Sequence, residues 1–116
     1  MSPITRIPTP YSYSAAVRAG DSVFLGLHRG FGDTFPAQCE SSLEGIRATL
    51  AQLDLPLENL VKVNVWLKNI KDLPEMEDLF HKYFAQDAFP ARMTSTTEFI
   101  DEDCLLMIEG VAYSGR

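Results

Sequence analysis

The sequence predicts an α+β domain in which two helices pack on one face of a mixed β-sheet. Two segments carry apolar residues at the spacing of amphipathic helices, and several short segments are rich in β-branched and aromatic residues. The two kinds of segment alternate, so the predicted order is ββαβαββ. A helix that joins two strands of one sheet makes a normally right-handed crossover, and two such crossovers place both helices on the same side.

Length and composition describe a single folded domain spanning residues 1–116. The chain has 46% hydrophobic and 22% charged residues, which are values typical of globular proteins. At 116 residues there is no room for a second core, and a domain this small often gains stability by self-association.

Charge and apolar patterning exclude several partners. The net charge is −6 and the basic residues are scattered, so nucleic acid is not an expected partner. No apolar run approaches the roughly 20 residues that span a bilayer, and the proline-rich start lacks an apolar signal segment. We therefore expect a cytoplasmic protein with no membrane partner. Cys39 and Cys104 lack the spacing of metal ligands, so they are predicted to be reduced core thiols, with no metal site.

The first third of the chain is predicted to be extended. Prolines punctuate residues 4–13 and disfavour helix. Residues 14–18 and 23–27 are two short β-rich runs around a Gly-Asp turn, which predicts a hairpin. Residues 28–35 contain two glycines and show no periodicity, so a loop is expected there.

The first helix is predicted over residues 37–54, where Pro56 follows and ends it. Its buried apolar stripe is predicted to contain Cys39, Leu43, Ile46, Leu50 and Leu53. Its solvent-facing side is predicted to contain Gln38, Glu40, Glu44, Arg47 and Gln52. Residues 59–68 then alternate strictly, which predicts a half-buried strand. Trp66 lies on its less apolar face, which indicates that another subunit covers that face.

The second helix is predicted over residues 73–84, with Pro74 in its first turn and acidic residues near its positive end. Residues 93–99 and 104–113 are two β-prone runs around the acidic turn 100–103. They are predicted to form an antiparallel pair, with the acidic turn in solvent.

Arg92 is the leading candidate for a functional residue. It follows Pro90, which stiffens its approach to a strand, and a rigidly held guanidinium matches a carboxylate or phosphate. Spacing alone favours a surface arginine or a structural ion pair with Glu98 or Glu109.

Six segments carry a resemblance to a known family, in order and over nearly the whole chain: residues 10–12, 17–25, 60–67, 76–84, 90–92 and 108–112. The sequence resembles the Rid family, also called the YjgF/YER057c or endoribonuclease L-PSP family. The resemblance implies chorismate-mutase-like homotrimers with ligand clefts between subunits. It also implies hydrolysis of 2-imino acids, such as 2-iminobutanoate and 2-iminopropanoate, to 2-oxo acids and ammonia without a cofactor. By the same resemblance, Arg92 would bind the carboxylate and Tyr11 would line the cleft.

The chain departs from the family at five positions around that arginine. Thr94 stands where active deaminases have a cysteine, and Met107 stands where they have the glutamate that activates water. Gly26, His28 and Glu77 replace a serine, a glutamine and an asparagine. Methionine cannot transfer a proton as glutamate does.

Three residues are alternatives for the missing proton-transfer group, since imine hydrolysis needs an anchored carboxylate, a water and a proton carrier. Glu109 lies two residues beyond Met107 and so about 7 Å along the same strand face. His28 has a side chain that titrates near neutrality, and Glu77 adds a carboxylate. Each also has a structural explanation: an ion pair for Glu109, a solvated loop for His28, and the helix dipole for Glu77.

Two functions follow as expectations. The first is a Rid-type imine deaminase with Arg92 and Glu109 as catalytic residues. The second is a non-catalytic trimer that binds a small carboxylate, which Met107, Thr94 and Gly26 favour. A ribonuclease is disfavoured by the charge of −6 and by the absence of a histidine pair or metal cluster in the sequence pattern.

Overall fold

The structure, a computed structural model, describes residues 3–115. Along the chain it contains the strands and helices β1 (Ile4–Pro8), β2 (Ser14–Ala19), β3 (Ser22–Arg29), α1 (Phe35–Ala51), β4 (Leu60–Leu67), α2 (Leu73–Tyr83), β5 (Ala91–Thr96) and β6 (Leu106–Tyr113). Two short 3₁₀ turns, Leu57–Asn59 and Ile70–Asp72, lead into β4 and α2.

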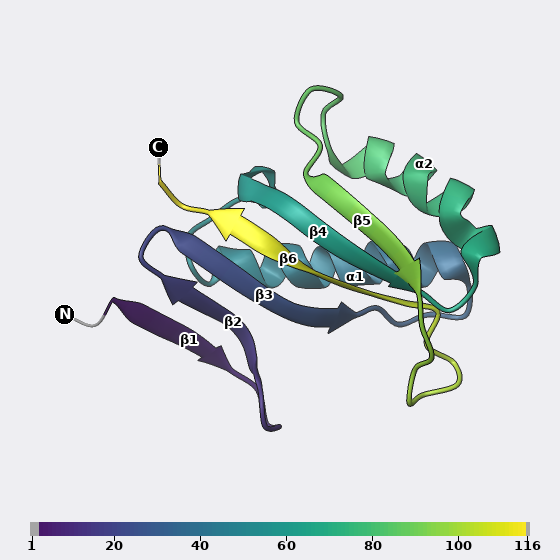
Figure 1. Ribbon diagram of the computed structural model, residues 1–116, viewed down its shortest axis with the longest axis horizontal. Coiled ribbons are helices and arrows are strands. Elements are labelled where there is room, and N and C mark those ends of the chain that lie inside the picture. Colours follow the sequence, from purple (N-terminus) through teal and green to yellow (C-terminus); the bar gives the residue numbers. More distant parts are fainter. Residues whose placement is uncertain (1–2, 116) are drawn as a thin grey trace.

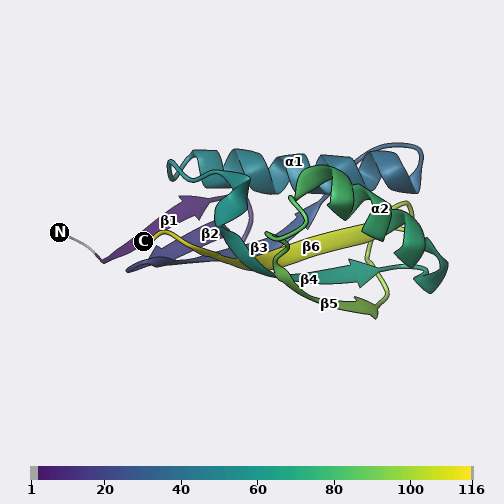
Figure 2. The same ribbon diagram turned by 90° about the horizontal axis from the view of Figure 1, so that it is seen from above.

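The six strands form one mixed sheet in the order β1-β2-β3-β6-β4-β5 (Figure 1). Strands β4 and β5 are parallel, and every other neighbouring pair is antiparallel. Both helices lie on the same side of the sheet, with α1 packed over β3 and β6 (Figure 2). The predicted fold class, two helices on one face of a mixed sheet, is confirmed.

Two details of the predicted topology are wrong. Residues 4–8 are not merely extended but form β1, which pairs with β2 and makes the order βββαβαββ. The last two strands do not pair with each other, because β6 inserts between β3 and β4 while β5 pairs in parallel with β4 at the edge. The central place gives β6 hydrogen-bonding partners on both sides and buries its alternate residues Leu106 and Ile108 under the helices.

Helix α1 begins two residues earlier than predicted. Thr34 caps it by accepting a hydrogen bond from the amide of Ala37 at 3.3 Å, and Pro36 lies in the first turn. The expected loop over residues 28–35 is correspondingly shorter, because His28 and Arg29 continue strand β3. Gln38 was predicted to face solvent but is only 2% exposed.

The core lies between the sheet and the two helices. It contains the apolar stripe of α1, the residues Met76 and Phe80 of α2, and the alternate side chains Val63, Val65 and Leu67 of β4. Cys39 and Cys104 are free and buried, as predicted. Within residues 3–115, no helix is long and apolar enough to cross a membrane.

Candidate functional site

Arg92 lies on the edge strand β5, next to the buried Pro90. The parallel register sets Arg92 beside Val63, whose side chain faces the helices, so Arg92 also points to the helix side. There its Nη2 donates to Oε2 of Glu77 at 3.1 Å, and its guanidinium carbon lies 5.5 Å from the centre of the Phe80 ring. Helix α2 therefore supplies both a carboxylate and an aromatic support for the arginine.

Most of the donors of Arg92 are not used by the protein. Within the described residues, Glu77 is the single hydrogen-bond partner of its guanidinium, and it contacts only Nη2. The side chain of Arg92 is 27% exposed and that of Glu77 is 51% exposed. Because a guanidinium carries five N–H groups in a fixed plane, Nε and Nη1 are available to an added carboxylate.

Thr94 follows two residues later on the same face of β5. Its Oγ1 is buried and has no hydrogen-bond partner in the described part of the chain. Alternate residues of a strand are about 7 Å apart, so Thr94 lies on the same face as Arg92, about that distance further along the strand. A buried hydroxyl without a partner is rare in folded proteins and marks a place where polar contact is incomplete.

Met107 and Glu109 lie on the other face of the sheet. In the register of β6 with β4 they stand opposite Trp66 and Asn64, on the face that no helix of this chain covers. Oε1 of Glu109 accepts a hydrogen bond from Nε1 of Trp66 at 2.9 Å. The expected structural pair of Arg92 with Glu98 or Glu109 does not form, because the partner of Arg92 is Glu77.

His28 lies beneath helix α1 rather than in a solvated loop. Its Nδ1 is 2.7 Å from the carbonyl oxygen of Gly26 and must donate to it, so in the neutral ring Nε2 accepts from the Thr49 hydroxyl at 2.9 Å. Burial lowers the pKa of His28, against the smaller raising effect of the Gly26 carbonyl. Both nitrogens are thus engaged, and the ring holds β3 to α1.

Tyr11 lies in the loop between β1 and β2 and is 74% exposed. Its ring stacks on that of Tyr13, with centroids 6.1 Å apart. This loop belongs to the β1–β2 end of the sheet, and Arg92 belongs to the opposite edge strand (Figure 1). A single chain therefore does not bring Tyr11 and Arg92 into one cleft.

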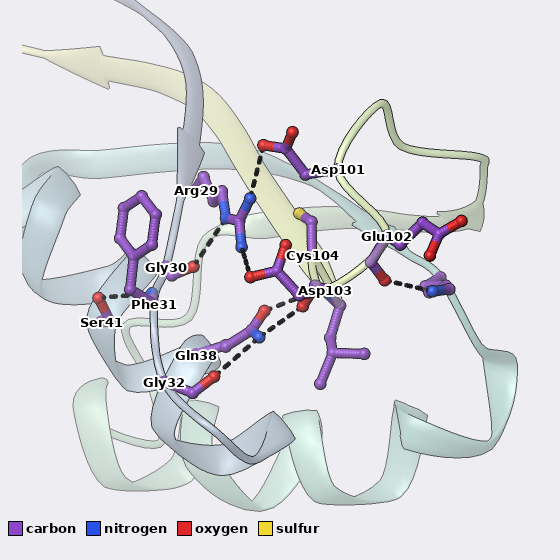
Figure 3. Close-up of polar contacts among 12 residues, drawn as sticks. Arg29, Gly30, Phe31, Gly32, Gln38, Ser41, Asp101, Glu102, Asp103 and Cys104 are labelled. Atoms are coloured by element: carbon purple, nitrogen blue, oxygen red, sulfur yellow. Dashed lines mark hydrogen bonds and ion pairs between the residues drawn. The ribbon is translucent and has the colours of Figure 1, made fainter.

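A second polar cluster, which sequence reasoning missed, surrounds Arg29 at the end of β3 (Figure 3). Its Nη1 and Nη2 donate to the carboxylates of Asp101 and Asp103 at 2.7 and 2.8 Å, and its Nε donates to the Gly30 carbonyl. The acidic turn is therefore ion-paired instead of simply solvated. The two aspartates at positions 101 and 103 could have indicated that the turn binds a basic side chain. Nothing in the sequence indicated that Arg29 is that side chain.

Gln38 completes this cluster from helix α1. Its Nε2 donates to the carbonyls of Gly32 and Asp103, and its Oε1 accepts from the amide of Leu105 at 2.8 Å. These bonds attach the loop before β6 to the start of the helix. In residues 3–115 no group of three or more His, Cys, Asp or Glu side chains is arranged to hold a metal ion.

The helix-free face of the sheet carries large apolar side chains that are exposed in the single chain. Phe24, Met93 and Tyr113 are 50%, 53% and 44% exposed there. Between β3, β4 and β6 it also has a shallow cavity of about 170 Å³, lined in part by Lys62, Asn64 and Glu109. Large exposed apolar side chains clustered on one face are typical of a surface that another molecule covers.

Comparison with known proteins shows the family to which the chain belongs. The sequence model of the endoribonuclease L-PSP family matches residues 4–114, so the chain belongs to this family, which is the Rid or YjgF family.

Relatives in this family are similar over most of their length. The chain is 29% identical to RutC family protein PH0854 of Pyrococcus horikoshii, covering 87% of this chain and 86% of that protein. It is 28% identical to a 2-iminobutanoate/2-iminopropanoate deaminase of Dermatophagoides farinae, covering 96% and 97%. A solved structure of a yjgF family member from Streptococcus pyogenes superposes with a TM-score of 0.91 at 25% identity over the full length of both chains.

Proposed function

We propose that this protein is a Rid-type deaminase that hydrolyses small 2-imino acids to 2-oxo acids and ammonia without a cofactor. The deaminase of Dermatophagoides farinae supports the reaction class. The observation that carries the proposal is the guanidinium of Arg92, which is fixed by Glu77 and Phe80 while Nε and Nη1 stay free. Such a group binds a substrate carboxylate in a fixed orientation.

Among the three alternatives for proton transfer, Glu77 is the residue that contacts Arg92. Glu109 lies on the opposite face of the same chain and is bonded to Trp66, and both ring nitrogens of His28 are engaged. We therefore assign the proton-transfer role to Glu77 in place of Glu109. Its carboxylate is half exposed, so water reaches it.

The proposed reaction then proceeds in two stages. The reaction starts from the imino acid with its nitrogen protonated as an iminium. Glu77 accepts a proton from water as the water oxygen bonds to the imine carbon and the C=N π electrons move to nitrogen, which gives a neutral carbinolamine. The protonated Glu77 returns that proton to the amine nitrogen, which becomes an ammonium group. The carbon–nitrogen bond then breaks and its electrons leave with ammonia, while the hydroxyl loses its proton to Glu77. Glu77 passes this proton to the departing ammonia, so 2-oxo acid and ammonium leave.

We further propose that the chain works as a homotrimer with clefts between subunits. The apolar, helix-free face supports self-association, and Tyr11 and Arg92 can meet only if they come from different copies. Light scattering coupled to size exclusion checks this. A mass of three chains is expected, and a monomer at micromolar concentration would contradict it.

The activity is tested with imines generated in place by an amino-acid oxidase acting on 2-aminobutanoate. Semicarbazide traps the imine that escapes hydrolysis, so an active deaminase lowers semicarbazone formation and speeds release of 2-oxo acid. We expect this effect with the native chain and its loss in Arg92→Ala. Equal rates with and without the protein, across several amino acids, would refute the proposal.

A second candidate is a trimer that captures a small carboxylate without turnover. The specific observation in its favour is Met107, which has no proton to exchange and lies on the helix-free face where the family resemblance places a glutamate. This function predicts a concentration-dependent rise in melting temperature with 2-oxobutanoate and no hydrolysis. Unchanged melting temperatures across a panel of carboxylates would argue against it.

A further inference from the structure

Arg92 and Glu77 form an ion pair with no net charge, and both side chains keep unused hydrogen-bonding atoms. The atoms Nη2 and Oε2 are 3.1 Å apart, while Nε and Nη1 of the arginine have no partner in residues 3–115. Oε1 of Glu77 likewise has no hydrogen-bond partner in that part of the chain. The pair therefore presents one set of free donors and one free charged acceptor next to each other, above the ring of Phe80.

We propose that Glu77 is a specificity-determining residue that makes this site prefer zwitterionic ligands, with a carboxylate and an ammonium or iminium on the adjacent carbon, over simple monoanionic acids. The inference rests on the proposed role of Arg92 as a carboxylate anchor. The added element is that the neighbouring carboxylate of Glu77 binds the charged nitrogen of the ligand.

The charges of such a ligand match those of the pair. In a 2-amino or 2-imino acid a single carbon–carbon bond joins the carboxylate to the carbon that bears the nitrogen. The two protein charges are in direct contact at 3.1 Å. The ligand carboxylate can bond one of the free donors of Arg92, Nε or Nη1, while its N–H groups bond Oε1 of Glu77, so each charge meets its opposite.

A monoanionic ligand experiences a less favourable electrostatic potential at the same site. The positive charge of Arg92 is already compensated by Glu77, so a 2-oxo acid that approaches the guanidinium also approaches a like charge. A site with a neutral amide at position 77 would not have this repulsion. Discrimination of this kind works by an introduced repulsion as much as by a new attraction.

This selectivity would also help turnover. Hydrolysis converts a zwitterionic imino acid into a monoanionic 2-oxo acid and removes the cation that Glu77 binds. The product then keeps the contact with Arg92 but loses the contact with Glu77, and it is released more readily than the substrate is.

Calorimetric titration with stable probes tests the inference without relying on catalysis. The probes are L-2-aminobutanoate, a zwitterion, and 2-oxobutanoate, a monoanion of the same chain length. We expect the native chain to bind the amino acid at least tenfold more tightly. Glu77→Gln should bind the amino acid at least tenfold more weakly than the native chain does and should bind 2-oxobutanoate severalfold more tightly. Glu75→Gln, an exposed carboxylate in the first turn of the same helix, is the matched control and should behave as the native chain.

The outcomes separate the inference from the function on which it rests. If both probes bind, Arg92→Ala abolishes binding, and Glu77→Gln leaves their ratio unchanged, the inference is overturned while the carboxylate anchor stands. If neither probe binds the native chain, or Arg92→Ala binds as well as the native chain, both fall. A melting curve for Glu77→Gln shows that the variant is folded, which is expected for a residue that is half exposed.

Discussion

Arg29 and Arg92 are the same residue type in opposite situations. Arg29 is 13% exposed, and all three of its nitrogens donate to Asp101, Asp103 or Gly30. Arg92 is 27% exposed, and one nitrogen contacts one carboxylate. Both guanidiniums also lie over an aromatic ring, at 4.7 Å for Arg29 and 5.5 Å for Arg92.

The difference teaches how to tell a structural arginine from one that is available to a ligand. Saturated donors hold two parts of a chain together, as Arg29 holds the end of β3 to the loop before β6 (Figure 3). Unused donors on a restrained side chain carry binding capacity that the fold itself does not consume. Disturbing one region at a time, by substitution, tests this comparison.

The largest expected effect is on ligand binding at Arg92. Arg92→Met removes the donors but keeps much of the apolar stem, so we expect carboxylate binding to weaken about 100-fold, because two charge-assisted hydrogen bonds are lost. The melting temperature should change little, since the exposed pair with Glu77 is worth at most about 1 kcal/mol. Titration and thermal unfolding measure the two quantities. A large loss of stability with unchanged binding would show that Arg92 is a structural arginine and not a ligand-binding one.

Gln38 should have the largest effect on stability in the Arg29 region. Gln38→Met keeps the length of the side chain but leaves the Leu105 amide and two carbonyls without their partner, and we expect a loss of about 2 kcal/mol. Gln52→Met, at the exposed C-terminal end of the same helix, is the control and should stay within about 0.5 kcal/mol of the native chain. Equal denaturation midpoints for the two variants would show that the buried amide does not hold this loop.

Arg29→Met should cost less than the Gln38 change, about 1 kcal/mol, because the two aspartates of Arg29 are mostly exposed and solvent screens the pair. Ligand affinity should be unchanged, in contrast to Arg92→Met. Chemical denaturation and titration of the two arginine variants side by side make the comparison. Loss of carboxylate binding in Arg29→Met would show that the ligand contacts the Arg29 region, which contradicts the structural role given to Arg29.

The smallest effect is a pH dependence from His28. Burial lowers its pKa below the ordinary 6.5, so the unfolded chain takes up this proton before the folded chain does. Stability from this source is fully present above about pH 6.5 and falls as the pH drops toward the folded pKa, by at most about 1.4 kcal/mol per pH unit. Denaturation midpoints between about pH 7 and pH 5 should therefore fall in the native chain and fall less in His28→Gln.

His81 provides the control for that experiment, because it is the only other histidine and its side chain is exposed on α2. His81→Gln should keep the pH dependence of the native chain. A slope that survives in His28→Gln but disappears in His81→Gln would contradict the assignment of the buried ring.

Local pattern predicted the elements well and their partners poorly. Strict alternation predicted β4, and the apolar stripe with Pro74 predicted α2, because both signals repeat within a few residues. Strand β1 was missed because its pairing with β2 stabilises it and no apolar alternation marks it. Gln38 was misplaced because a polar residue inside an amphipathic helix shows the same pattern whether water or a buried loop receives its hydrogen bonds.

In the candidate site too, the residue could be predicted from the sequence but its neighbours could not. Arg92 was predicted from its motif and its family resemblance, and the structure places it at an edge strand next to a carboxylate. Which of Glu77, Glu109 and His28 lies beside it could not be predicted. Glu109 is on the opposite face only because β6 pairs with β4 in the observed register, and His28 is enclosed only because α1 crosses β3.

The sequence by itself determined the alternation of strands and helices, the burial of the apolar stripes, and the arginine that follows a proline into β5. The tertiary structure alone decided that this arginine meets Glu77, fifteen residues earlier in the chain, and that Arg29 meets an acidic turn more than seventy residues later. Periodicity follows from the local geometry of helices and strands, so it can be read from neighbouring residues. Partners across a crossover depend on how whole elements pack, and no short segment of the chain contains that information.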